Sequence, residues 1–519
     1  MKTELEVRDR SAPENQEEMG AWIHPSQRMT EGLTFDDILV MPAPSQILPK
    51  DTNTKTTLCP GIDLFAPFVS SPMDRVTEAK MAIAMALFGG IGILHREMGS
   101  EGLIKAILDV KRFMAGKIND PVTVQPTQDL ASVRDLELPY TGFPVIDEMG
   151  PRGKRTLVGI LTRRDMDGKP PESKVSEIMT PRSEMLVGDP VASLTLAKAL
   201  LRNRKVEKLP LVDSDDQLVG LITRRDLDLR DENPNATTDL EGRLQVGAAI
   251  GTKDFNAMLK LVGDLIQAGV DFVCIDSAHG GHIQIVQAVQ VLKHMFPNLP
   301  IMAGNVADKD GAAELILAGA DVLRVGFGSG SICTTRVVSG CGVPQITAII
   351  ECREAVEEHQ GEIGRKITIV SDGGATEPGH STKAIAAGAS AMMFGSLLAG
   401  TKESPGEIVK RSGVKYKKYR GMGSEAAMKE HGGDRYFKEG EGGKLLAEGV
   451  SGLVPYKGSV KDQLEKLHGG LKSGMGYNGA KTIQDLWKAR IVKVTNAGLK
   501  ENYPHHLAAI EGDESQGEE

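Results

Sequence analysis

Aromatic residues are scarce in this sequence, at 4% of its 519 positions, and no block of basic residues dominates it. Base-stacking platforms for single-stranded nucleic acid depend on aromatic side chains, so the composition disfavours them. The formal net charge of −9 also disfavours duplex nucleic acid, because contacts to phosphates need a basic surface. Nucleic acid is therefore not an expected partner.

Cysteine is also rare, and long apolar runs are missing. The five cysteines include no C-x-x-C pair and are odd in number, which favours a reducing compartment and leaves at least one thiol for chemistry. No uncharged apolar stretch reaches the ~20 residues of a membrane span. Met1–Glu18 is charged and lacks an apolar centre, so no signal peptide is expected. We therefore expect a cytoplasmic protein that does not enter a membrane.

Glycine is abundant, with 59 residues, and strand-like segments alternate regularly with helix-like ones. The expected strands cover residues 65–70, 91–95, 244–250, 271–276, 299–306, 320–326, 366–372 and 391–394. The expected helices cover residues 102–113, 255–268, 283–295, 311–318, 346–359 and 381–387. Each helix must return the chain to the same edge of the sheet, so the strands run parallel. The predicted fold class is α/β, a (β/α)8 TIM barrel, and a doubly wound open sheet is the alternative.

An internal repeat interrupts this alternation. Leu157–Asp165 (LVGILTRRD) and Leu218–Asp226 (LVGLITRRD) are identical at seven of nine positions. The repeat resembles a tandem pair of cystathionine-β-synthase (CBS) domains, which commonly bind adenine or guanine nucleotides. The resemblance implies a purine nucleotide (ATP, GTP or GDP) as ligand. The first copy is shortened before Pro144, and an accessory module without ligand is the alternative.

These features divide the chain into five expected parts. They are a tail at 1–28, the first part of the barrel at 29–118, the CBS pair at 119–235 (about 119–171 and 172–235), the rest of the barrel at 236–505, and an acidic tail at 506–519. Asp120-Pro121 and Asn233-Pro234-Asn235 flank the insertion, as is typical of a module placed in a barrel loop.

The segment after the strand expected at 320–326 carries the clearest chemistry. It reads GFGSGSICTT from Gly326 to Thr335. A loop that follows a barrel strand lies on the catalytic face, and alternating glycines let the backbone approach ions or phosphate closely. Cys333 on such a loop can act as a nucleophile; a buried loop cysteine without a chemical role is the alternative.

Two later strand ends are typical of a phosphate site. Asp372–Gly374 (DGG) and Gly395–Ser396 each follow an expected strand and precede a helix-like segment. Asp372 can also accept hydrogen bonds from a ribose diol. Each dipeptide is a weak signal alone, and their order along the barrel pattern makes them informative together.

Residues 326–345 (GFGSGSICTTRVVSGCGVPQ) resemble the active-site loop of the IMP dehydrogenase / GMP reductase family. Further family-like segments run in one order along the chain, at 33–40, 71–74, 89–92, 276–277, 304–306, 419–424, 434–437 and 448–452. The resemblance covers about residues 30–510. The Arg435–Tyr436 pair and the inserted repeat favour the dehydrogenase branch over the reductase branch. A non-catalytic nucleotide sensor is the remaining alternative.

The dehydrogenase branch implies oxidation of IMP to XMP with NAD, the committed step of guanine nucleotide synthesis. Cys333 would attack C2 of the purine, and a hydride would pass to NAD, which leaves a covalent thioimidate. A mobile flap at 415–458 would then bring Arg435 to activate water. Tyr436 would tune Arg435, and Thr335 would orient the water.

The resemblance also implies which residues hold each ligand. The substrate-binding residues would be Ser71, Met73, Ser331, Asp372, Gly374, Gly395, Ser396, Tyr419, Gly421, Met422, Gly423 and Glu448. The cofactor-binding residues would be Asp276, Ser277, Asn305, Arg324 and Gly326.

A potassium ion is implied as well. Carbonyl groups of Gly328, Gly330 and Cys333 would form half of its cage, and a neighbouring subunit would complete the cage near Glu501. The sequence reads Glu-Asn-Tyr from Glu501, where bacterial relatives typically have Glu-Ser-His, so this half departs from the family pattern. A cage shared between subunits implies a homotetramer, with an octamer of paired tetramers left open.

Overall fold

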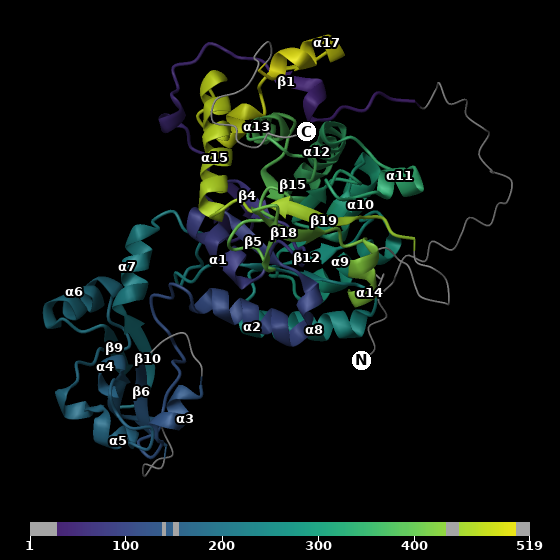
Figure 1. Cartoon of the computed structure of the whole chain (residues 1–519). Coiled ribbons are helices and arrows are strands. Elements are labelled where there is room, and N and C mark those ends of the chain that lie inside the picture. Colours follow the sequence, from purple (N-terminus) through teal and green to yellow (C-terminus); the bar gives the residue numbers. More distant parts are fainter. Residues whose placement is uncertain (1–28, 137–141, 149–154, 432–445, 505–519) are drawn as a thin grey trace.

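A closed barrel of eight parallel strands forms the larger part of the molecule (Figure 1). The structure is a computed structural model that describes residues 29–136, 142–148, 155–431 and 446–504. The barrel strands are β4 (Phe68–Ser70), β5 (Ile91–Leu94), β11 (Gly247–Ile250), β12 (Phe272–Asp276), β13 (Ile301–Val306), β14 (Val322–Val325), β15 (Thr368–Asp372) and β16 (Ala391–Phe394). Pairing of β5 with β11 and of β16 with β4 closes the ring. The barrel prediction is therefore confirmed, and the open sheet is excluded.

A helix follows each barrel strand and covers the outside of the ring (Figure 1). These helices are α1 (Ala79–Phe88), α2 (Gly99–Arg112), α8 (Phe255–Ala268), α9 (Ile283–Met295), α10 (Lys309–Ala318), α12 (Gln345–Ile363), α13 (Gly379–Ala386) and α15 (Val460–Tyr477). Helix α8 illustrates how local sequence sets the bounds. Asp254 accepts hydrogen bonds from the N–H groups of Asn256 and Ala257, and Gly269 ends the helix at a φ of +93°.

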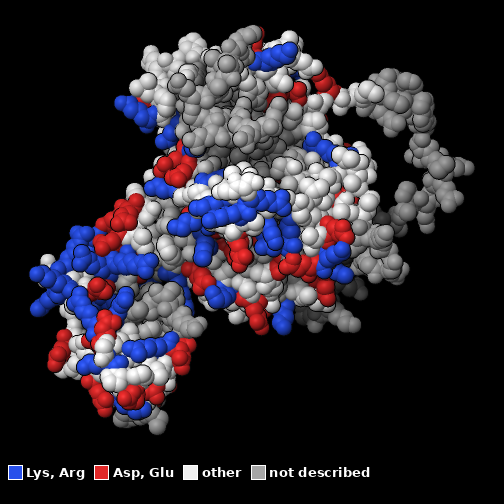
Figure 2. Space-filling model, in the orientation of Figure 1, with Lys and Arg blue, Asp and Glu red and all other residues white. Residues whose placement is uncertain are grey.

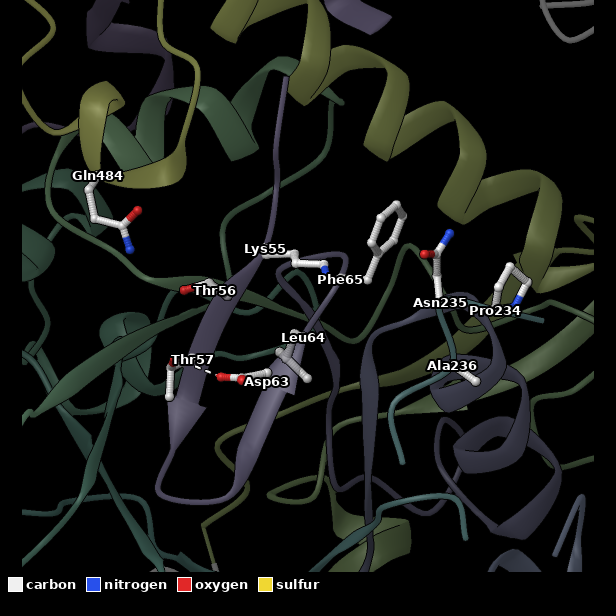
Figure 3. Close-up of a pocket in the computed structure, with 10 residues that line it drawn as sticks. All are labelled: Lys55, Thr56, Thr57, Asp63, Leu64, Phe65, Pro234, Asn235, Ala236 and Gln484. Atoms are coloured by element: carbon white, nitrogen blue, oxygen red, sulfur yellow. Dashed lines mark hydrogen bonds between the residues drawn. The ribbon is translucent and has the colours of Figure 1, made fainter. Parts of the chain in front are cut away.

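A hairpin closes the amino-terminal end of the barrel. Strands β2 (Thr56–Cys59) and β3 (Ile62–Leu64) bury Leu58 and Leu64 in one cluster with side chains from inside the barrel. A shallow hollow lies beside this hairpin, between Lys55, Asn235 and Gln484 (Figure 3). Figure 3 also shows the hydrogen bond from Thr57 Oγ1 to Asp63 Oδ1, 2.7 Å, which ties the two strands together.

A smaller unit, at the lower left of Figure 1, interrupts the barrel between α2 and β11. It contains the sheets β6-β7-β8 and β9-β10. Its strands are β6 (Gly142–Asp147), β7 (Thr156–Thr162), β8 (Thr180–Pro181), β9 (Lys208–Val212) and β10 (Leu218–Thr223). Its helices are α3 (Leu130–Arg134), α4 (Arg163–Met166), α5 (Val175–Ile178), α6 (Leu194–Arg204) and α7 (Arg224–Glu232).

The repeated Thr-Arg-Arg-Asp sequence has the same structural role in both copies. Thr162 and Thr223 each end a strand, and Asp165 and Asp226 each accept a hydrogen bond from the threonine hydroxyl, 2.8 and 2.5 Å. This is the start of a helix in both copies, α4 and α7. The repeat therefore encodes a strand-to-helix turn. Lys and Arg side chains gather over α6 and α7 (Figure 2), where several pair with acids such as Asp228.

A third antiparallel sheet lies against the barrel and consists of β17 (Ile408–Arg411), β18 (Val414–Arg420) and β19 (Ser451–Pro455). Helix α14 (Glu425–His431) follows β18. The flap expected at 415–458 thus begins and ends in two strands that pair with each other.

The chain ends in short elements beside the barrel. Strand β20 (Ile491–Lys493) pairs with β1 (Ile38–Val40), and α16 (Ile483–Leu486), α17 (Asn496–Leu499) and a 3-10 helix at Lys500–Asn502 flank it. Within the described ranges, no helix has both the length and the apolar composition that crossing a membrane takes.

Candidate active site

One cavity is lined by residues at the carboxyl ends of β4, β12, β13, β14 and β15, the end of the barrel where parallel topology places an active site. It holds about 740 Å³, its open mouth included. Its lining residues are Ser71, Met73, Ala278, Asn305, Arg324, Gly326, Phe327, Gly328, Ser329, Gly330, Ile332, Cys333, Thr335, Asp372, Gly373, Tyr419, Gly421, Met422 and Glu448.

Cys333 lies on the wall of this cavity, between β14 and the short helix α11 (Thr335–Ser339). Its thiol donates to Thr335 Oγ1 over 3.2 Å, and Thr335 is buried. Backbone contacts hold the turn in place, because Thr334 N–H donates to Glu448 O over 3.0 Å and Val450 N–H donates to Ile332 O over 3.0 Å. Cys333 is thus half-buried, reachable from the cavity and fixed by a second segment of the chain.

The other cysteines have different surroundings. Cys59, Cys274 and Cys352 are buried, and burial raises the pKa of Cys59 and Cys352 well above the ordinary value. Cys341 is exposed. Cys333 is the cysteine that lines the cavity, which favours the nucleophile interpretation over a buried cysteine without a role.

A buried ionic network forms part of the cavity wall. Arg324 donates from Nη1 to Asp276 Oδ1 over 2.6 Å and from Nε to Asp372 Oδ2 over 2.8 Å. Asn305 Nδ2 donates to the same Asp372 oxygen over 3.0 Å. Although burial opposes its charge, the two carboxylates raise the pKa of Arg324 above its ordinary value. Arg324 therefore stays charged and holds Asp372 in one orientation.

The expected phosphate-binding residues only partly share the cavity wall. The Tyr419 ring is buried, and a methyl group built on Gly395 would lie 3.0 Å from Tyr419 Oη. Burial raises the pKa of Tyr419, and a hydrogen bond with Ser331 acts in the opposite direction. The hydroxyl is therefore a neutral donor next to Gly395 and Ser331.

The remaining expected residues fall into three groups. Ser71, Met73, Gly421, Met422 and Glu448 line the cavity together with Asp372 and Tyr419. Ser331, Gly374, Gly395, Ser396 and Gly423 are outside its lining residues. Arg435 and Tyr436 lie outside the residues that the structure describes.

The cofactor group is divided as well. Asn305, Arg324 and Gly326 line the cavity, whereas Asp276 and Ser277 are 4% exposed and do not. Asp276 accepts from Arg324 instead of facing the cavity. Ser277 Oγ and Asn305 Oδ1 are buried oxygens without a hydrogen-bond partner among the described residues. Such atoms favour a polar ligand on this side.

The implied potassium ligands are found on two separate elements. Gly328 and Gly330 line the cavity, and the Gly330 carbonyl accepts from Cys333 N–H over 3.0 Å. Glu501 is exposed in the 3-10 helix near the end of the chain. No cluster of His, Cys, Asp and Glu suited to a metal occurs in the described ranges, so a cation here would bind carbonyl oxygens.

Sequence reasoning missed several residues of the site. Ala278, Phe327, Ser329 and Ile332 line the cavity, and all of them are neighbours of predicted site residues. Their positions beside recognised motifs were the available signal. Arg336 was also missed, although it directly follows the Cys333-Thr-Thr sequence.

The barrel and its cavity define the class of protein: a β/α-barrel enzyme with a cysteine-bearing loop at the carboxyl ends of its strands. Residues 32–505 match the sequence model of the IMP dehydrogenase / GMP reductase domain. The chain belongs to this family, and the resemblance seen in the sequence is confirmed.

Similar proteins include curated IMP dehydrogenases and solved GMP reductases. The inosine-5′-monophosphate dehydrogenase of Aquifex aeolicus is 44% identical over 488 residues, which cover 93% of this chain and 96% of the relative. That of Bacillus subtilis is 44% identical over 482 residues, 92% of this chain and 96% of the relative. A cysteine-to-alanine variant of Trypanosoma brucei GMP reductase, in complex with guanosine 5′-monophosphate, matches with a TM-score of 0.86 and 35% identity, over 94% of this chain and all of that one.

Proposed function

We propose that this chain is an IMP dehydrogenase that oxidises IMP to XMP with NAD. The observation that carries the proposal is the half-buried Cys333 thiol on the cavity wall, 3.2 Å from the hydroxyl of Thr335. The higher identity to IMP dehydrogenases, 44%, than to the solved GMP reductases, 35%, supports oxidation over reduction.

The proposed reaction passes through one covalent intermediate on the protein. The Cys333 thiolate adds to C2 of the purine, and the C2 hydride leaves with its electron pair. NAD, when bound, accepts that hydride. Water then attacks the thioimidate, which returns the thiol and releases XMP, so IMP, NAD and water give XMP, NADH and a proton. The thioimidate divides one difficult displacement into two easier steps.

Asp372 is proposed to hold the ribose of IMP. One of its oxygens, Oδ2, accepts from both Arg324 and Asn305, which leaves Oδ1 for the ribose hydroxyls. Tyr419, as a neutral donor, fits a phosphate oxygen next to Gly395 and Ser331. Ser71, Met73 and Met422 are proposed to surround the base.

NAD is proposed to bind on the side of the cavity near Asn305 and Gly326. The unpartnered oxygens of Ser277 and Asn305 support a polar ligand there. Potassium is proposed to bind the carbonyl oxygens of Gly328, Gly330 and Cys333, since such oxygens are the ligands this ion takes. A neighbouring subunit would add ligands near Glu501, which leads us to propose a homotetramer.

The second half of the reaction is assigned to Arg435, with Tyr436 tuning it. In the proposal Arg435 activates water, and Thr335 orients it beside the thioimidate. Arg435→Ala is therefore expected to give one rapid burst of NADH and then stall. Equal loss of the burst and of the steady state would remove the hydrolysis-specific role.

Absorbance at 340 nm tests the main proposal. IMP with NAD should raise it, and Cys333→Ala should abolish the rise while IMP still binds. A fall with GMP and NADPH, and no rise with IMP and NAD, would make the chain a GMP reductase. No change in either assay, with nucleotide binding retained, would indicate a non-catalytic sensor.

The smaller unit is proposed to bind a purine nucleotide. Asp226 is largely buried, which raises its pKa, and it accepts from Thr223 beside the second strand-to-helix turn. Calorimetric titration of the full chain with ATP, GTP and GDP tests this binding.

Light scattering with each nucleotide distinguishes a tetramer from an octamer of paired tetramers. The free cysteines favour action in the cytoplasm.

A further inference from the structure

The loop that carries Cys333 leaves the barrel and returns to the same place. Phe327 and Val343 form an isolated antiparallel bridge at its mouth. The seventeen residues from Phe327 to Val343 therefore form a closed excursion, with Cys333 and α11 at its far end. A closed excursion of this kind keeps its shape only if something joins its two sides.

Arg336 provides that connection from inside the loop. Its Nε and Nη2 donate to the Phe327 carbonyl over 3.2 and 3.1 Å, and Nη2 also donates to the Val343 carbonyl over 2.5 Å. The planar guanidinium can reach both carbonyls at once, whereas an ammonium presents a single point charge. One side chain thus joins both strands of the bridge to the helix next to the nucleophile.

Two glycines make room for this side chain. A methyl group built on Gly328 would lie 2.7 Å from Arg336 Cγ, and one built on Gly342 would lie 2.5 Å from the same atom. No real side-chain carbon tolerates contacts this short, so the aliphatic part of Arg336 passes between two positions that have to be glycine. Gly328 also has a φ of +68°, which favours glycine by itself, whereas Gly342 has no positive φ, so the close approach of Arg336 is the reason for a glycine there.

Charge links Arg336 to the reacting sulfur as well. Partial burial lowers the pKa of Arg336, and the charge of Cys333 acts in the opposite direction. The guanidinium of Arg336 therefore lies close enough to the Cys333 side chain for their charges to interact.

We propose that Arg336 is a positioning residue that holds the nucleophile loop in its reactive shape. The proposal rests on the reaction proposed above for Cys333. It also implies that Arg336 and the monovalent cation share one task, because the guanidinium binds the carbonyl next to Gly328. Without Arg336, the cation would have to hold the loop together with the Phe327–Val343 bridge and the backbone contacts of residues 448 and 450.

Alkylation of Cys333 by iodoacetamide tests the proposal without NAD and without turnover. Tandem mass spectrometry separates the product from that of exposed Cys341. Loss of hydrogen bonds to a charged group corresponds to a change of about 10- to 100-fold. We expect Arg336→Gln to lower both the alkylation rate and the NADH burst rate by that factor, and Arg336→Lys to lie between it and the wild type.

Gly342→Ala is an independent variant that leaves the charge unchanged. Its methyl group would displace the side chain of Arg336, so it should reproduce the effect of Arg336→Gln. Arg411→Gln, which changes an exposed arginine at the end of β17, is the matched control and should behave as the wild type.

Replacement of potassium by choline tests whether Arg336 and the cation both hold the nucleophile loop. The alkylation rate of Arg336→Gln should fall more steeply with potassium removal than that of the wild type; an equal dependence on potassium would show that the two do not share this role.

Wild-type alkylation and burst rates in both Arg336→Gln and Gly342→Ala would overturn the positioning role. A wild-type enzyme that makes no NADH would instead refute the proposed function, while the alkylation comparison would still stand.

Discussion

Arg324 and Asp372 form a buried ion pair, in which the guanidinium Nε donates to Asp372 Oδ2 over 2.8 Å. Arg324 is 2% exposed, and its other end donates to Asp276. Strands β12, β14 and β15 supply these three residues, so one side chain joins the ends of three strands. The pair therefore serves both the stability of the barrel and the orientation of a carboxylate at the site.

Arg324→Met should destabilise the protein strongly, because it leaves two carboxylates without their countercharge. Removal of one partner of a buried ion pair costs about 3–5 kcal/mol. Urea unfolding followed by circular dichroism measures this loss. In Arg353→Met, whose guanidinium lies over the Trp487 ring, the loss should stay below about 1 kcal/mol. Equal losses in the two variants would contradict the argument.

Thr335→Val should separate the two halves of the reaction. Valine keeps the shape of threonine but removes the hydroxyl that accepts from Cys333. We expect the first burst of NADH to remain and the release of XMP to slow by about 10²-fold. Rapid mixing at 340 nm measures the burst, and chromatography measures XMP. A burst that slows as much as XMP release would show that Thr335 does not act on the water.

Gly326→Ala should displace the nucleophile loop. The glycine has a φ of +149°, and a methyl group on it would lie 2.1 Å from the Asp372 carbonyl oxygen. A shift of about 1 Å can cost 10²-fold in rate, so the NADH burst should slow by about that factor. Gly340→Ala is the control, because its φ is +71° and no atom lies within 4 Å of the added methyl. Gly340→Ala therefore introduces backbone strain without a steric clash. If its NADH burst were as slow as that of Gly326→Ala, the loss would be due to strain and not to the clash with Asp372.

Stability should fall as the pH falls from about 6.5 to 4, in part through His468. Burial lowers the pKa of His468 to about 4, against about 6.5 for a free histidine. The unfolded chain therefore binds the proton first, and the contribution present above pH 6.5 is lost as the pH falls toward 4. The loss is at most about 3 kcal/mol at pH 4.

His468→Gln tests this directly. His468 Nε2 lies 2.8 Å from Thr54 Oγ1, which itself donates to Phe65 O, so the imidazole is the donor in this contact. Glutamine keeps a donor but does not titrate, and the urea midpoint should depend less on pH in this window. His294→Gln, at an exposed histidine, should leave the pH dependence unchanged. Parallel pH curves for the wild type and His468→Gln would disprove the assignment.

Much of the barrel could be predicted because its signals are local. Helices α8 and α9 have the predicted bounds, since a capping side chain and the apolar period mark both ends within a few residues. The predicted strands at 244–250 and 320–326 were each three residues longer than β11 and β14. Apolar residues that precede a strand are buried like the residues within it. The sequence pattern therefore does not show where the strand begins.

The cavity was predicted by motif but not by side-chain direction. Asp276 ends β12 as expected, yet its carboxylate faces Arg324 instead of the cavity. That choice depends on a residue 48 positions away, which no local pattern reports. The role of Arg336 was also missed. Its acceptors are backbone carbonyl groups, which every residue has, so no residue type in the sequence marks them.

The sequence by itself determined the alternation of strands and helices, the internal repeat and the loop with Cys333, because each depends on residues close together in the chain. Only the tertiary structure decided which groups meet across the barrel: the pairing of Arg324 with two carboxylates, the contact of residues 448–450 with the cysteine turn, and the hold of Arg336 on its own loop. Those contacts depend on distances between atoms far apart in sequence, and closure of the eight-stranded ring sets these distances.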